Sequence, residues 1–135
     1  METGMNTNEM HLVMAETQAG KMTFPEVVGR LLAIGVESYF VDFAAGTETL
    51  YMTDGETHVE AMSLARESIA EEFSLAGIVD AIRGAQADTI RYPEFAKRST
   101  AAGVIAYWAF LTGKKVIYFG RKGEMHIEEF PRSKP

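Results

Sequence analysis

The stretch TFPEVVGRLLAIGV at residues 23–36 recurs in related form as RYPEFAKRSTAAGV at residues 91–104. When residue n is placed against residue n + 68, proline, glutamate, arginine, alanine, glycine and valine match in the same order. Matches at one fixed spacing over this length indicate an internal duplication rather than chance similarity. The duplication is the feature of the sequence that decides the fold.

The similarity extends on both sides of this stretch. Upstream, Gln18-Ala19 lies over Gln86-Ala87, which adds a preceding helix to the repeated unit. Downstream, GETHVE at residues 55–60 matches GEMHIE at residues 123–128. We therefore predict that each copy contains the preceding helix, the helix that begins at the proline and a strand region.

The strand regions are aligned with one deletion at Ala45 and one insertion at Lys122. The residues that this alignment pairs are Gly46 with Gly113 and Tyr51 with Tyr118. We predict one domain over residues 1–135, with internal repeats at residues 9–60 and 74–128 and a helical connector at residues 61–73.

In each repeat the pattern predicts two helices followed by three short strands. Pro-Glu at residues 25–26 and again at 93–94 suits a first helical turn, because proline lacks an N–H and a carboxylate favours the positive helix end. Asp54-Gly55 between alternating runs predicts a hairpin turn. We expect an α+β fold, a tandem duplication of a helix–helix–three-strand meander unit. Its antiparallel strands form one sheet or two, with helices packed on a face.

Composition and charge favour a cytoplasmic globular protein. No run of 18 apolar residues predicts a membrane span, and the absence of cysteine excludes disulfides and thiol catalysis. The net charge of −6 argues against nucleic acid as a partner. The charge is uneven: residues 1–82 carry 3 Lys/Arg and 14 Asp/Glu, and residues 83–135 carry 10 Lys/Arg and 5 Asp/Glu. Opposite net charges favour side-by-side packing of the halves, within one chain or across a homodimer.

The duplicated motif Gly-Glu-x-His-[Val/Ile]-Glu is the strongest candidate for chemistry. Alternate residues of a strand share a face, so each histidine has glutamates beside it on the same face. Such a set could bind a divalent metal. The same pattern is typical of the solvent face of a short edge strand, whose charges discourage edge-to-edge aggregation. The candidate metal ligands are His58, Glu60, His126 and Glu128.

Aromatic residues on the predicted strands form a second candidate set. This set could stack a ring-bearing ligand, although aromatic residues on strands also build cores. Its members are Tyr39, Tyr107, Trp108, Tyr118 and Phe119. Asp42 follows the strand residues Tyr39-Phe40-Val41, where it could cap the next turn or act as an acid in a cleft. We take Tyr39, Asp42, Tyr107 and Trp108 as candidate ligand-binding residues.

The sequence lacks the phosphate-binding loops, the nucleophile elbow and the HExxH motif of well-known enzyme classes. It therefore favours a non-catalytic domain that binds a small ligand or a protein partner, with a homodimer as one possibility. The alternative is a metal-binding or hydrolytic enzyme that uses the duplicated Glu-x-His-x-Glu strands. No cofactor is indicated.

The chain also resembles the YbcV-like family of uncharacterised proteins, whose members are often labelled phage envelope proteins. The likeness is carried by YFVD at residues 39–42, YPEF at residues 92–95 and GEMHIEEFP at residues 123–131. Because this family is a domain of unknown function, the resemblance implies no activity, cofactor or catalytic residue.

Overall fold

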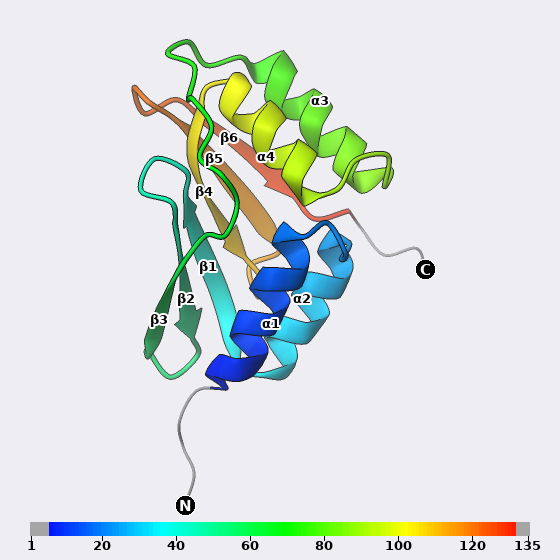
Figure 1. The fold of residues 1–135 in the computed structure, drawn as a ribbon, viewed down its shortest axis with the longest axis vertical. Coiled ribbons are helices and arrows are strands. Elements are labelled where there is room, and N and C mark those ends of the chain that lie inside the picture. The colour runs from blue at the N-terminus through cyan, green and yellow to red at the C-terminus, as the bar shows by residue number, and fades with distance from the viewer. Residues whose placement is uncertain (1–5, 132–135) are drawn as a thin grey trace, which may run out of the picture.

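The computed structural model describes residues 6–131, which form four helices and six strands (Figure 1). The elements of the first repeat are α1 (Thr7–Gln18), α2 (Phe24–Ala33), β1 (Val36–Asp42), β2 (Thr47–Met52) and β3 (Thr57–Ala61). Those of the second are α3 (Leu75–Gln86), α4 (Tyr92–Ala101), β4 (Val104–Phe110), β5 (Lys115–Gly120) and β6 (Met125–Glu129). The predicted α+β duplication of a helix–helix–three-strand unit is confirmed.

The six strands form one antiparallel sheet in the order β3-β2-β1-β4-β5-β6. The two repeats join through β1 and β4, where Phe40 pairs with Trp108. These two residues are 68 positions apart and therefore occupy equivalent places in the two copies. A pseudo-twofold axis consequently crosses the sheet between them, and β3 and β6 lie at its opposite edges.

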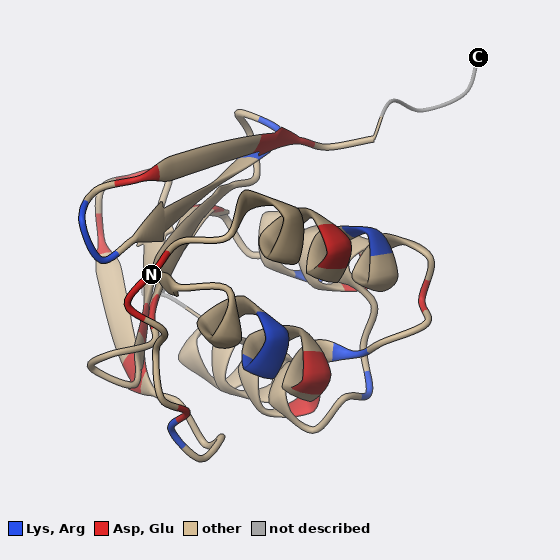
Figure 2. Ribbon diagram, turned by 90° about the horizontal axis from the view of Figure 1, so that it is seen from above, with Lys and Arg blue, Asp and Glu red and all other residues tan. Residues whose placement is uncertain are grey.

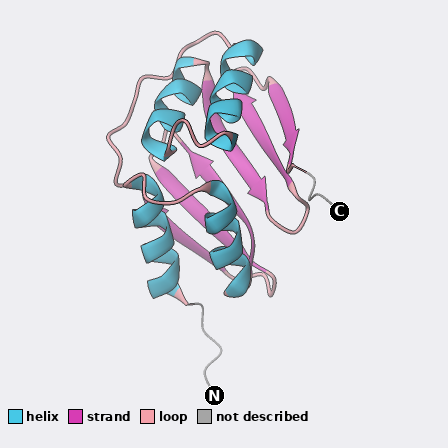
Figure 3. Cartoon of the chain, turned by 90° about the vertical axis from the view of Figure 1, so that its right-hand side faces the viewer, coloured by secondary structure: helices cyan, strands magenta, loops and turns pink. Residues whose placement is uncertain are grey.

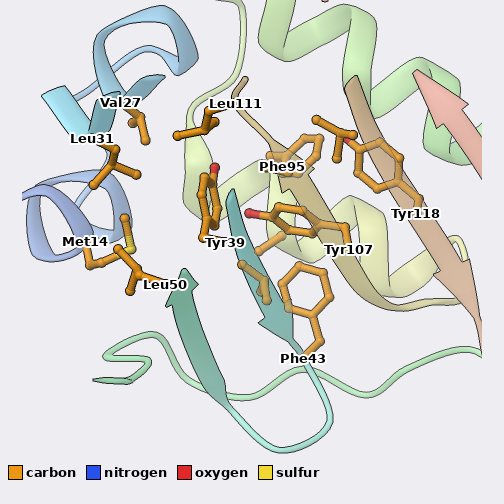
Figure 4. Close-up of a cluster of buried hydrophobic side chains, with 14 of the residues drawn as sticks. Met14, Val27, Leu31, Tyr39, Phe43, Leu50, Phe95, Tyr107, Leu111 and Tyr118 are labelled. Carbon is orange, nitrogen blue, oxygen red and sulfur yellow. The ribbon is translucent and has the colours of Figure 1, made fainter. Parts of the chain in front are cut away.

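Both helical hairpins cover the same face of this sheet (Figures 2 and 3). The core lies between the two layers and includes the fully buried side chains of Val13, Leu31, Val41 and Ile78. Buried aromatic rings continue it across the middle of the sheet (Figure 4). Within residues 6–131, no helix has the length and apolar character needed to cross a membrane.

The backbone shows that the two repeats align without a gap. Residues with a positive φ occur in pairs 68 positions apart: Gly20 and Asp88, Gly35 and Gly103, Gly46 and Lys114, Gly55 and Gly123. The predicted deletion and insertion are therefore wrong, because the turn after β4 reaches its left-handed position with Lys114, not with the neighbouring glycine.

This correction changes which tyrosines are equivalent. Tyr118 is buried toward the helices and corresponds to Leu50, whose side chain is also buried. Tyr51 corresponds to Phe119, and both are only partly buried. The predicted equivalence of Tyr51 and Tyr118 is wrong, because these residues point to opposite faces of the sheet.

The predicted helical connector at residues 61–73 is also wrong, since Ala61 ends β3 and residues 62–73 are irregular. The backbone N–H of Ala70 donates to the carbonyl of Thr100, and that of Ser74 donates to the carbonyl of Ala102. These bonds satisfy carbonyls at the C-terminal end of α4, which a helix cannot satisfy internally. The segment is thus held by α4, by the turn after β1, where Gly46 accepts from Met62, and by Gln18 of α1, rather than by hydrogen bonds of its own.

Gly103→Ala is expected to destabilise the protein by about 3 kcal/mol or more, since the left-handed φ of 87° is strained for alanine and overpacking adds to it. A Cβ at this position would run into the backbone carbonyl of Glu72. Urea unfolding measures the loss.

The matched control is Gly35→Ala in the first repeat. Its φ of 90° is nearly the same, but a Cβ there meets only the flexible end of Met52 at 3.4 Å. About 1–2 kcal/mol is expected. Equal losses in the two variants would contradict the assigned role of the Glu72 contact.

Candidate functional site

A cavity of about 330 Å³ opens between the two helical hairpins, over the strands of the second repeat. One wall is the start of α2, and the opposite wall is the end of α3 together with the start of α4. The strands β4, β5 and β6 supply the floor. The cavity is therefore built from both repeats but lies on one side of the pseudo-twofold axis.

Aromatic rings form the inner surface of the cavity (Figure 4). The ring centroids of Tyr107 and Tyr118 are 5.5 Å apart, and the Phe95 ring lies 6.3 Å from each of them. Tyr39 meets Tyr107 edge to face at 6.2 Å. Such a surface offers both ring faces and ring edges to an aromatic ligand.

Tyrosine hydroxyls provide polar groups in this apolar surface. The hydroxyl oxygens of Tyr92 and Tyr107 are 2.8 Å apart and share a hydrogen bond. Burial raises the pKa of Tyr39, Tyr92, Tyr107 and Tyr118 well above the usual value of a tyrosine. The hydroxyls therefore stay neutral and serve as hydrogen-bond donors or acceptors.

At the rim of the cavity, hydrogen bonds fix the position of the Glu128 carboxylate. Glu128 accepts hydrogen bonds from Arg83 at 2.7 Å and from Gln86 at 3.4 Å, and its other oxygen lies 3.1 Å from His126 Nε2. Burial opposes ionisation of Glu128, but the hydrogen bonds from Arg83 and His126 outweigh it and hold its pKa below the usual range. The carboxylate is ionised at neutral pH.

An aromatic pair lies beside the rim, where the Phe24 and Phe130 rings meet edge to face at 5.3 Å. Phe24 begins α2 of the first repeat, and Phe130 follows β6 of the second. Both residues line the cavity. Movement of either ring would therefore change access to it.

The equivalent place in the first repeat is closed by a buried polar clamp. The side chain of Gln18, which is 5% exposed, donates to Glu48 Oε1 at 2.8 Å, and Glu48 is 3% exposed. Gln18 also accepts hydrogen bonds from Ser63 and from the backbone N–H of Leu64. These bonds tie α1 both to β2 and to the segment that follows β3.

The second repeat has no such clamp because Val116 stands where the first repeat has Glu48. Gln86, the counterpart of Gln18, is exposed and turns outward to Glu128. Gln86 and Val116 both line the cavity. The space between α3 and β5 is therefore open where its counterpart is filled.

The structure separates the candidate ligand-binding residues. Tyr39 and Tyr107 line the cavity. Trp108 lies on the opposite face of the sheet, where its indole N–H donates to Ser38 Oγ at 3.3 Å. Asp42 accepts from the backbone N–H of Ala45 at 2.9 Å, as expected of the turn cap.

The candidate metal ligands are not brought together. His58 and Glu60 lie on β3, and His126 and Glu128 lie on β6, at opposite edges of the sheet. Each histidine shares a hydrogen bond with the glutamate two residues along, at 3.0 Å and 3.1 Å, and His11 is the other histidine near Glu60, at 3.3 Å. Within residues 6–131, no group of three or more His, Cys, Asp and Glu side chains is placed to hold a metal ion.

Sequence reasoning did not identify Tyr92, Phe95, Gln86 and Val116 as site residues. The spacing of Tyr92 and Phe95 at i and i+3 puts both on one face of α4, but this pattern is equally typical of a core helix. The difference between Glu48 and Val116 carried the signal for the cavity. It was hidden by the misplaced gap in the repeat alignment.

Comparison with protein families matches residues 14–129 to the family described as "Protein of unknown function (DUF1398)". The chain belongs to this family. The match runs from within α1 to the end of β6, so the DUF1398 region contains both strand meanders, the buried clamp and the aromatic floor of the cavity. No curated protein matches the chain.

The clamp makes stability depend on pH, because burial raises the pKa of Glu48 to about 8 from a usual 4.5, and nearby Glu60 adds to the rise. A raised pKa means that the folded state holds the proton more tightly than the unfolded state does. The stabilisation from protonated Glu48 is therefore complete below about pH 4.5 and is lost as the pH rises toward 8.

In Glu48→Gln the side chain cannot ionise, so this loss is absent. Relative to the wild type, the free energy of unfolding of the variant should rise by about 2 kcal/mol between pH 5 and pH 7. Urea titrations at several pH values measure it, with the exposed Glu56→Gln as control. Parallel pH profiles of the wild type and Glu48→Gln would show that Glu48 does not titrate in this way.

Proposed function

We propose that the protein is a non-catalytic binding domain that takes a small, largely apolar, ring-bearing molecule into the cavity between its helical hairpins. The observation that carries the proposal is the open cavity of about 330 Å³ with its tyrosine and phenylalanine floor. This volume is at the lower end of the range typical of ligand sites. A single or fused ring system suits its size.

The contrast between the repeats supports binding. A duplicated unit whose first copy is closed by buried hydrogen bonds could keep its second copy closed in the same way. The second copy instead has Val116, an exposed Gln86 and a cavity that is lined by largely buried aromatic rings. A ligand would supply the contacts that the Gln18–Glu48 clamp supplies in the first copy.

The groups around the cavity favour binding over turnover. The tyrosine hydroxyls are neutral at physiological pH, and Glu128 is already paired with Arg83. These groups orient a bound molecule by hydrogen bonds more readily than they move its protons. The alternative of a metal-dependent or hydrolytic enzyme has no geometric support, since its two histidines lie on opposite edges of the sheet.

The finer assignment to YbcV-like proteins remains a proposal that rests on the motifs at residues 39–42, 92–95 and 123–131. It adds no ligand, and the phage envelope label adds no argument about the cavity.

We expect 2-naphthol, a fused ring with one hydroxyl, to bind saturably in the micromolar to millimolar range. Titration followed by protein NMR should shift the signals of Tyr118 and Phe95. Ala85→Phe places a ring in the cavity from α3 and should weaken binding at least tenfold, because it occupies the ligand volume.

Ala87→Phe is the matched control, since Ala87 is exposed, lies two residues further along and does not line the cavity. Its affinity should stay within about twofold of the wild type. Equal weakening in both variants, or no saturable shift in the wild type, would overturn the proposed site.

A further inference from the structure

The face of the sheet that the helices leave uncovered is rich in aromatic and aliphatic side chains. Trp108 lies at its centre, with ring centroids 5.3 Å from Phe40, 5.3 Å from Tyr51 and 5.2 Å from Phe110. On the edge strands, Val59 is 59% exposed and Ile127 is 50% exposed. The other large apolar residues that alternate onto this face are Ile117, Phe119 and Met125.

This face differs from the usual outer face of an antiparallel sheet, which is polar when water covers it. Figure 2 shows both hairpins on one side of the sheet and, for residues 6–131, no helix on the other. The large apolar residues of this uncovered face cluster on β1, β4, β5 and β6, and an exposed apolar cluster of this kind marks an interaction site. Because it lies opposite the ligand cavity, its role is independent of the proposed ligand.

We propose that a second copy of this chain stacks on the uncovered face, sheet against sheet, with the dimer axis parallel to the strands. This axis runs between β1 and β4 and places the first repeat of one copy over the second repeat of its partner. The dimer is then a two-sheet sandwich, with a hairpin layer on each outer side.

Side-chain size favours this orientation. The register aligns Val59, Thr49, Phe40, Trp108, Ile117 and Ile127 in one row across the sheet. In the proposed dimer the partner's strands follow in the opposite order across the interface, so Thr49 of one copy lies opposite Ile117 of the other. In the next row it places Thr47 opposite Phe119 and Ala61 opposite Met125. Small side chains of the first repeat of one copy thus pack against large side chains of the second repeat of the other copy, which favours close packing.

Net charge favours the same orientation. The first repeat (residues 9–60) has 7 more acidic than basic residues (9 against 2), and the second repeat (residues 74–128) has 3 more basic than acidic residues (8 against 5). The strand-parallel axis brings the acidic repeat of each copy over the basic repeat of the other. An axis across the strands would instead place like over like, which costs free energy.

The area is sufficient for a specific dimer. Six strands about 4.8 Å apart span about 29 Å, and five residues at about 3.3 Å each span about 17 Å. The flat area of one face is therefore about 500 Å², and the two faces of a dimer together bury about 1,000 Å². This area reaches the lower limit for a biological interface, and the side chains that project from the sheet add to it.

Sedimentation equilibrium of the full chain at 1–100 μM tests the proposal. The wild type should be a dimer, and Ile127→Lys and Val59→Glu should each raise the dissociation constant at least tenfold. Leu75→Lys is the control, because Leu75 is 54% exposed on α3, away from this face. It should leave the dimer unchanged.

The double variant Val59→Glu, Ile127→Lys tests the orientation. With the proposed axis, the glutamate introduced on β3 of each copy lies near the lysine introduced on β6 of the other copy. The double variant should therefore recover dimer affinity relative to either single variant. The two positions lie at opposite edges within one copy, so recovery cannot arise inside a single chain.

A wild-type monomer at 100 μM would overturn the proposal and assign the face to a partner of another sequence. A dimer that both single variants leave intact would place the interface elsewhere. A double variant weaker than each single variant would contradict the strand-parallel axis.

Discussion

The antiparallel pairing of β1 with β4 determines the arrangement of the rest of the molecule. It joins the two copies at their equivalent residues Phe40 and Trp108, so one continuous sheet forms. Both helical hairpins must then lie on the same face, because the pseudo-twofold axis is perpendicular to the sheet and rotation about it does not exchange the two faces. The same operation sends β3 and β6 to opposite edges.

Three functional consequences follow from this junction. The histidine motifs are separated, although each is repeated in sequence. The hairpins meet over the centre of the sheet, where Tyr39 and Tyr107 come from equivalent positions and touch. The uncovered face becomes a single apolar surface rather than two small ones, which makes it large enough to hold a second sheet.

The proposed ligand site lies where the copies differ. Glu48 and Gln18 close one half with a buried hydrogen bond, and burial of a carboxyl group makes that half sensitive to pH. Val116 removes the carboxyl group from the other half, where the cavity lies over largely buried aromatic rings. Differences between the two copies, Glu48 against Val116 and Leu50 against Tyr118, thus convert a structural position into a candidate ligand site.

The duplication, the element types and the α+β class could be predicted from the sequence, because Pro-Glu starts, glycine turns and alternating strands are local signals. The connector could not, since its backbone hydrogen bonds go to groups distant in sequence: Gly46, Gln18 and the end of α4. Glycine identity misplaces the repeat alignment near residue 113, because Lys114 and not Gly113 adopts the positive φ that Gly46 has in the first repeat. The cavity was missed because it depends on contacts between repeats.

Intermolecular NOEs between 2-naphthol and the assigned protein test most directly whether the cavity is the binding site. The cavity has Tyr118 and Phe95 in its lining, and the uncovered face has Trp108 and Tyr51. NOEs from the naphthol ring to Tyr118 and Phe95 are expected. NOEs to Trp108 and Tyr51 alone would contradict a ligand site between the hairpins.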